Sequence, residues 1–162
     1  MADVVVRARE GRLARRGAAD RGPVREFLAF VLAGELYGIE LTRIREILSP
    51  PPITYVPRSA KHVIGVCSVR GMLVTVIDLR CRLSLEQRPA TRRTRILLTQ
   101  TDSGEVVGLY VDEVKLVMRL AEPEIEMASA ILGGDVSEHV LGIGRPSGQV
   151  IVLLDLGSIV PR

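Results

Sequence analysis

One hairpin pattern occurs twice in this sequence and constrains the fold more than any other feature. Residues 63–80, VIGVCSVRGMLVTVIDLR, contain two runs of β-branched and aliphatic residues around a turn at Gly71, which is typical of two paired strands. A shift of 77 positions without a gap lays Gly65 on Gly142, and residues 140–156, VLGIGRPSGQVIVLLDL, repeat the pattern. Two copies of one β unit predict two related halves.

The segments before the two hairpins also correspond. Residues 27–32 and 35–40 predict two strands joined by a tight turn, because short apolar runs flank Ala-Gly. Residues 42–48, TRIREIL, have apolar residues at helical spacing, so one or two helical turns are expected there, ended by the three prolines that follow. A shift of 70 positions repeats the order of strand, turn, strand and short amphipathic segment in residues 96–118.

We therefore predict an all-β fold of two pseudo-repeated, five-stranded small barrels with a few short helices. The first barrel is expected over residues 26–85, a polar connector over 86–94, and the second barrel over 95–160. The connections within each half are too short for helical crossovers between parallel strands. Closure of each small sheet into a barrel would remove its exposed edges.

The charge is unevenly distributed along the chain. Residues 1–25 hold seven arginines and three acidic residues without apolar periodicity, which predicts a flexible Arg-rich extension. The remaining residues are almost neutral, with fifteen basic and sixteen acidic side chains, so the folded part is not basic. Cys67 and Cys81 lack metal-site spacing and are expected to be reduced thiols. No apolar run is long enough to cross a membrane, and a cytoplasmic location is expected.

Three blocks of sequence together resemble the signature of CheW-type chemotaxis adaptor (coupling) proteins. They are EFLAFVLAGELYGIELTRIREIL, VPRSAKHVIGVCSVRGMLVTVIDLR and VVGLYVDEVKLVMRL, and the resemblance extends from Glu26 to Val160. Y-G-I-E followed by R-E-I, G-V-x-x-x-R-G followed by D-L-R, and V-G-L-x-V-D-x-V are highly specific in combination. The resemblance implies two SH3-like barrels within one CheW-like domain, residues 26–162, without catalysis or cofactor.

The same resemblance implies the partners of the chain. A CheW-type protein is expected to bridge the cytoplasmic tips of chemoreceptors (methyl-accepting chemotaxis proteins) and the regulatory domain of a CheA-type histidine kinase. It would be recruited in this way to membrane-associated receptor arrays. Because the two halves are related, two surfaces could engage two kinase molecules and build larger assemblies through avidity.

The resemblance also places the contacts. The receptor tip is expected in a groove between the halves, as a helix in an apolar groove. The expected groove residues are Leu41, Ile44, Leu48, Val111 and Val114. For Leu41 and Val111, a role as core residues is an equal alternative. Gly65 is expected to face the kinase, because a residue without a side chain allows close backbone approach, with a purely conformational glycine as the alternative.

Glu46 and Arg70 are predicted to form an ion pair that serves receptor and kinase coupling. Under the two shifts Glu46 corresponds to Leu116 and Arg70 to Ser147, so the second half builds the same structure without either charge. Both charges also fall on the R-E-I and R-G motifs of the resemblance. We expect the Arg70 guanidinium to fork onto the Glu46 carboxylate, with two unrelated surface charges as the alternative.

The residues that could suggest an enzyme have structural explanations. Asp78 and Asp155 occupy duplicated positions where a strand gives way to a short helix, so both are expected to be helix N-caps. His62 and His139 also correspond, and neither has accompanying ligands, so no metal site is predicted. No phosphate-binding loop is present in the sequence.

A small-barrel protein that binds single-stranded nucleic acid is the alternative function. Such binding uses aromatic side chains beside a basic groove. The aromatic residues of the chain are Phe27, Phe30, Tyr37, Tyr55 and Tyr110. The first three lie in core-like strands, which favours the adaptor over the nucleic-acid binder.

Overall fold

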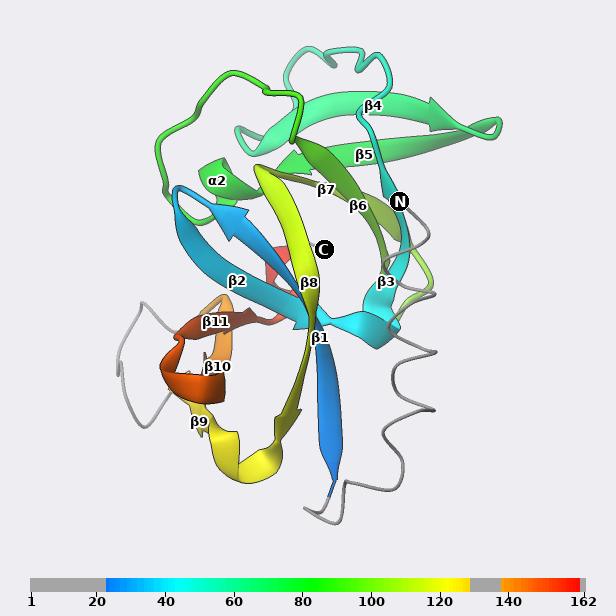
Figure 1. The fold of residues 1–162 in the computed structure, drawn as a ribbon. Helices are drawn as coiled ribbons and strands as arrows, with labels where there is room; N and C mark the ends of the chain where they lie inside the picture. The colour runs from blue at the N-terminus through cyan, green and yellow to red at the C-terminus, as the bar shows by residue number, and fades with distance from the viewer. Residues whose placement is uncertain (1–22, 129–137, 161–162) are drawn as a thin grey trace.

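The computed structural model describes residues 23–128 and 138–160, and these fold mainly into two β-sheets (Figure 1). The six-stranded sheet has the order β8-β1-β2-β11-β10-β9, and the five-stranded sheet has the order β3-β6-β7-β5-β4. In chain order, the strands of the first sheet are β1 (Val24–Leu32), β2 (Glu35–Glu40), β8 (Glu113–Ala121), β9 (Ile125–Met127), β10 (Val140–Gly144) and β11 (Ile151–Leu154). Those of the second are β3 (Ile44–Leu48), β4 (Val63–Val69), β5 (Met72–Asp78), β6 (Arg95–Gln100) and β7 (Val106–Val111).

Helices are few and short, and the all-β prediction is confirmed. They are η2 (Leu41–Arg43), α2 (Leu79–Arg82), η3 (Glu122–Glu124), η5 (Pro146–Gly148) and α4 (Leu156–Ile159). The connector, residues 86–94, contains neither helix nor strand, as predicted. Five strands are found in one sheet, whereas the other has a sixth because β9 pairs with β10. The Arg-rich extension lies, except for its last three residues, outside the described residues.

The helical prediction for residues 42–48 was wrong, since only η2 is helical and the rest is strand β3. A β-bulge explains the misleading apolar spacing. Ile44 pairs with Thr99 and Glu46 with Leu98, which leaves one residue of β3 without an opposite partner. Residues three apart in a regular strand face opposite sides, but this extra residue lets both Ile44 and Ile47 face the core. The corresponding segment of the second half is a strand too, β8, with a bulge opposite β1.

The division into consecutive barrels, residues 26–85 and 95–160, was also wrong. The β1–β2 hairpin lies in the sheet of the second half, and the β6–β7 hairpin lies in the sheet of the first half (Figure 1). Each exchanged hairpin joins its sheet through one parallel pairing, β2 with β11 and β7 with β5. Local patterns are identical whether a hairpin pairs within its own half or with the other, so the sequence repeat could not distinguish the two arrangements.

The repeat itself is confirmed down to single pairs. Gly38 pairs with Leu153 and Gly108 pairs with Val76, which are equivalent pairs under the two shifts. Asp78 and Asp155 accept hydrogen bonds from the backbone N–H of Arg80 at 3.0 Å and Gly157 at 3.1 Å. Both predicted N-caps are therefore present, one in each half.

The largest hydrophobic cluster lies between the two sheets. It contains buried residues from both halves, among them Leu28, Phe30, Ile77, Leu109 and Leu156. Two smaller clusters lie within the individual sheets, one around Phe27 and the other around Cys67. The exchanged hairpins contribute to the central cluster, so the two halves form one shared core.

Candidate functional site

An ion pair joins strand β3 to the β4–β5 turn. Arg70 Nη1 lies 2.6 Å from Glu46 Oε2, and Arg70 Nη2 lies 2.6 Å from Glu46 Oε1. This is the predicted bidentate pair. β3 and β4 are the two outer strands of the five-stranded sheet, so the pair connects its opposite edges. The hydrogen bond from Arg70 lowers the pKa of Glu46 below its ordinary value, and the same bond raises the pKa of Arg70.

The backbone of this turn does not depend on the ion pair. Arg70 has φ of 49° and Gly71 has φ of 80°, the left-handed combination that two-residue hairpin turns require. The equivalent Ser147 and Gly148 have φ of 54° and 80° without any charge at either position. The Arg70 side chain is 75% exposed, whereas that of Glu46 is 22% exposed. The pair therefore presents one guanidinium, held in one orientation, at the surface of the first half.

Four of the five predicted groove residues lie together in the central core. Leu41, Ile44 and Val111 are buried, and the half-buried Val114 packs against the same cluster. Leu48 lies apart from them, half-buried against the cluster around Cys67. The equal alternative for Leu41 and Val111, a role as core residues, agrees with this burial. Of the predicted set, Val114 and Leu48 offer accessible surface to a partner.

Gly65 is buried beneath a neighbouring segment of its own chain. A Cβ atom on Gly65 would lie 2.1 Å from the backbone oxygen of Thr54, which bridges to Val66 in β4. A Cβ atom on Gly142 would lie 2.6 Å from the backbone oxygen of Glu126. The close backbone approach seen here occurs within the chain and in both halves, which agrees with the alternative of a structural glycine, and the predicted contact with the kinase stays a prediction. Any influence of Gly65 on a partner would therefore be indirect.

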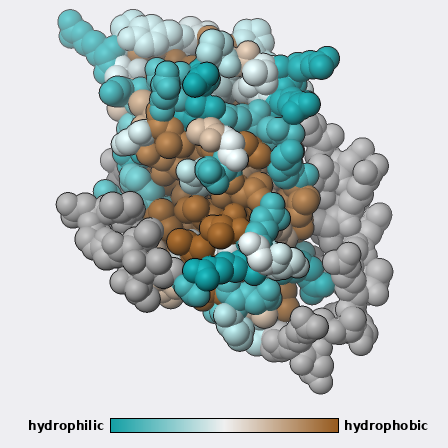
Figure 2. Space-filling view, turned by 60° about the vertical axis from the view of Figure 1, so that its left-hand side comes forward, coloured by the Kyte–Doolittle hydropathy of each residue, from teal (hydrophilic) through white to brown (hydrophobic). Residues whose placement is uncertain are grey.

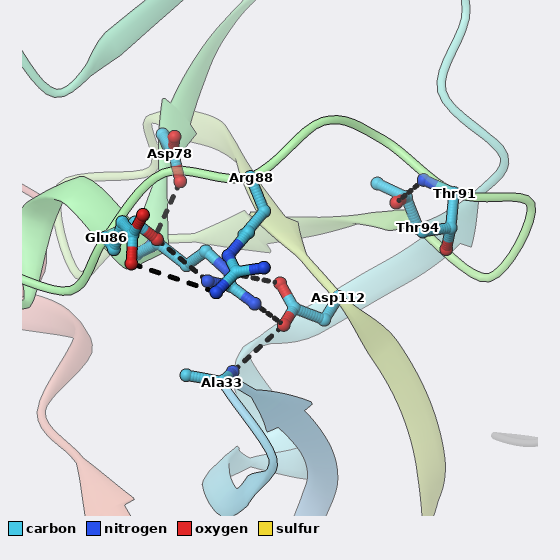
Figure 3. Close-up of polar contacts among 8 residues, drawn as sticks. Ala33, Asp78, Glu86, Arg88, Thr91, Thr94 and Asp112 are labelled. Atoms are coloured by element: carbon cyan, nitrogen blue, oxygen red, sulfur yellow. Dashed lines mark hydrogen bonds and ion pairs between the residues drawn. The ribbon is translucent and has the colours of Figure 1, made fainter.

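A second ion pair, Arg80 with Asp112, was not identified from the sequence. Arg80 Nε donates to Asp112 Oδ1 at 2.8 Å, Arg80 Nη2 donates to Asp112 Oδ2, and the backbone N–H of Ala33 donates to the same Oδ2 at 2.9 Å (Figure 3). Burial alone would raise the pKa of Asp112, but hydrogen bonds from Arg80 and Ala33 outweigh it and lower that pKa. The signal was available, because Arg80 belongs to D-L-R and Asp112 to V-G-L-x-V-D-x-V.

The described part of the chain offers no cluster of three or more His, Cys, Asp or Glu side chains able to hold a metal ion. His139 Nδ1 lies 2.7 Å from Ser158 Oγ, and burial lowers the pKa of His62.

Within residues 23–128 and 138–160, no helix is long and apolar enough to span a membrane.

The family model for the CheW-like domain matches residues 26–162. The chain belongs to the CheW-like family. It is 26% identical to chemotaxis protein CheW of Helicobacter pylori over 143 residues, which cover 88% of this chain and 86% of that protein. It is 31% identical to protein FrzA of Myxococcus xanthus over 146 residues, which cover 88% of this chain and 89% of that protein.

A solved structure has the same fold. The crystal structure of the scaffolding protein TtCheW from Thermoanaerobacter tengcongensis superposes with a TM-score of 0.77 at 28% sequence identity. The match covers 85% of this chain and 92% of TtCheW. The two-sheet, SH3-like arrangement is therefore that of a CheW scaffold, and the chain is a chemotaxis scaffold or adaptor by family.

Proposed function

We propose that this chain couples the cytoplasmic tips of chemoreceptors to the regulatory domain of a CheA-type histidine kinase, without catalysing a reaction. In this role it acts in the cytoplasm and is recruited to membrane-associated receptor arrays. The Glu46–Arg70 pair is the observation that carries the proposal. The two charges occur in one half only, the equivalent Ser147 and Gly148 adopt the same left-handed φ angles without them, and the guanidinium is largely exposed. A fixed surface charge that the fold does not need is available for a partner.

The test is a reconstituted signalling complex of receptor, kinase and this adaptor, with kinase phosphorylation as the readout. Arg70→Ala should leave the protein folded and abolish receptor control of the kinase. Arg58→Ala is the matched control, because Arg58 is also exposed and also has a positive φ of 62° in the first half. Equal control of the kinase by both variants would remove Arg70 from the coupling surface.

The receptor contact is proposed for the surface around Val114, the accessible member of the predicted groove that packs against the central cluster. Ile44→Glu would not test this contact cleanly, because Ile44 is 6% exposed and a carboxylate there would be buried in the core. Val114→Glu changes a half-buried position, and Val150→Glu is the control at an exposed apolar position just before β11 of the same sheet. Receptor co-sedimentation should fall for the first variant and persist for the second. Persistence in both would place the receptor contact elsewhere.

The nucleic-acid alternative is not favoured by the aromatic side chains. Phe27 and Phe30 are fully buried, and Tyr37 stacks on Phe30 with ring centroids 6.3 Å apart. Tyr110 is half-buried, which leaves Tyr55, 68% exposed, as the one well-exposed aromatic ring in the described residues. A single ring is not a platform for successive bases. Salt-sensitive, tight binding of residues 26–162 to single-stranded DNA would reverse this conclusion.

A further inference from the structure

A cavity of about 620 Å³ opens between the β1–β2 turn, helix α2 and the connector. Its apolar lining comes from Ala33, Leu85, Pro89 and Ala90, and its charged lining from Arg80, Glu86 and Arg88. Ligand pockets in proteins have volumes of roughly 300–1,000 Å³ and combine apolar walls with a few polar groups. None of the residues proposed to contact receptor or kinase lines this cavity.

One wall of the cavity is a guanidinium held in place. Arg80 is bidentate to Asp112, and its Nη1 also donates to the backbone oxygen of Glu86 at 2.7 Å. A guanidinium has five N–H groups, so two remain after these three bonds. Because the surrounding bonds already fix the side chain, little conformational entropy would be lost when a ligand accepts from it.

The cavity is also lined by a second arginine, Arg88, which has unused donors. Figure 3 shows the Arg88 side chain extending from the connector toward the Arg80–Asp112 pair. Its closest acidic contact is Glu86 at 3.8 Å, beyond hydrogen-bond distance, and both side chains are largely exposed. No hydrogen bond from Arg88 to another described residue is present. Glu86 is the one carboxylate among the lining residues, against the guanidinium groups of Arg80 and Arg88, so N–H donors outnumber acceptors in the cavity and an anionic acceptor could accept hydrogen bonds from the donors that remain.

An apolar area lies on one side of the molecule. Figure 2 shows the side of the molecule where β2 and β11 lie, and hydrophobic side chains gather there in one area bordered by hydrophilic ones. Four half-buried residues pack against the central cluster: Tyr37 of β2, Val152 of β11, and Leu83 and Leu85 after α2. An exposed apolar area with a polar rim is typical of a protein contact surface.

The repeat provides an internal comparison. The related groove of the other half is lined by Glu40, Asp102 and Asp155 with Arg43, and Gly157 stands at the position of Arg80. Its volume is about 80 Å³. The connector residues that line the larger cavity have no counterpart in the lining of the smaller groove, so the two sites differ in backbone as well as in side chains.

We propose that this cavity binds a peptide segment of a partner protein in which a carboxylate side chain lies between apolar side chains. The carboxylate accepts from Arg88 and from the free N–H groups of Arg80, and the apolar neighbours cover Ala33, Leu85 and Pro89. Charge-assisted hydrogen bonds of this kind are about twice as strong as neutral ones. This site does not depend on the coupling function, because it shares no residue with the receptor and kinase contacts.

The test is a titration of the full chain with the peptide Ac-Leu-Glu-Leu-Glu-Leu-NH₂, followed by amide NMR shifts and calorimetry. Binding should shift the amides of Gly34 and Thr91, which line the cavity. Arg88→Glu should weaken binding at least tenfold. Arg92→Glu is the matched control, with the same charge change in the same connector at a residue that does not line the cavity, and should change affinity less than twofold. Arg88→Gln removes the charge without reversing it and should give an intermediate loss of peptide affinity.

Three results would overturn the proposal. The first is an equal loss for Arg88→Glu and Arg92→Glu, which would indicate a general electrostatic effect. The second is binding of Ac-Leu-Gln-Leu-Gln-Leu-NH₂ with equal affinity, which would show that the peptide carboxylate is not recognised. The third is displacement of the peptide by inorganic phosphate or by phosphatidylglycerol vesicles at lower concentration, which would identify a phosphate or lipid ligand instead. Receptor control of the kinase should be unchanged by Arg88→Glu in all cases, so failure here is distinguishable from failure of the coupling function.

Discussion

The two hairpins β4–β5 and β10–β11 share several backbone features but have different surfaces. Each has a bulge at a glycine, an aspartate cap at its exit and two consecutive left-handed residues between its strands, but β4 and β5 are joined by Arg70 and Gly71 alone, whereas residues 145–150 join β10 and β11. The first turn carries Arg70 paired with Glu46, whereas the corresponding residues of the second half are the uncharged Ser147 and Leu116, the latter 49% exposed. What the copies share is required by the fold, and what they do not share is free to serve partners.

Substitution of the two shared glycines, Gly65 and Gly142, should have the largest effect on stability. In Gly65→Val the new side chain would meet the Thr54 backbone oxygen at 2.1 Å, and in Gly142→Val it would meet the Glu126 oxygen at 2.6 Å. Backbone atoms cannot move aside as a flexible side chain can, so each variant should lose about 3 kcal/mol of unfolding free energy, with the greater loss at Gly65. Urea unfolding would measure both losses. A stable Gly65→Val protein would contradict the structural role of this glycine.

The next largest effect on stability should come from removing one of two ion pairs, which lie at corresponding turns of the two halves. Asp112 and Arg80 hold the β1–β2 turn in a partly buried setting, whereas Arg43 pairs with the 84% exposed Asp102 in the β6–β7 turn. Arg80→Ala should cost about 2 kcal/mol, because a partly buried carboxylate loses its partner. Arg43→Ala should cost at most about 0.5 kcal/mol. Thermal unfolding of both variants would measure the difference in stability. Equal losses would show that burial does not make the Arg80–Asp112 pair contribute more than the Arg43–Asp102 pair.

The buried pair should also give a pH signature. The pKa of Asp112 is lowered in the folded state, so its contribution to stability is complete above the unfolded value, about 3.9, and is lost as pH falls through the lower folded value. Asp112→Asn removes this titration. The unfolding free energy of the parent protein should therefore fall more steeply than that of Asp112→Asn below about pH 4. Parallel curves in that range would show that Asp112 is not responsible.

The sequence predicted these local features better than their assembly. The hairpins, the aspartate caps and the Glu46–Arg70 pair follow from short-range patterns and from the comparison of one repeat with the other. The β3 segment was misassigned because a bulge gives a strand the spacing of a helix. The exchange of hairpins between sheets could not be predicted, because equivalent strands satisfy the same pattern in either half. The Arg80–Asp112 pair crosses 32 positions and could have been proposed from its motifs alone.

Rebuilding the Glu46–Arg70 ion pair in the second half should have the smallest effect on stability. It should also test the comparison of the two halves most sharply. Leu116→Glu with Ser147→Arg would place both charges at the equivalent positions of the second half. Ser147 already has φ of 54°, close to the 49° of Arg70, so the backbone should accept the change. The melting temperature should stay close to that of the parent protein, because exposed ion pairs contribute little.

The functional outcome of this double variant decides what the pair does. If a fixed guanidinium beside the turn is sufficient for coupling, the variant should restore some receptor control of the kinase in an Arg70→Ala background. If coupling also needs the surrounding surface of the first half, including the exposed Met72 and Leu73, control should stay absent although the second pair forms. The single variant Ser147→Arg is the control, because it adds the charge without the carboxylate that orients it. The reconstituted kinase assay separates these outcomes, and a crystal structure of the double variant would show whether the two side chains meet.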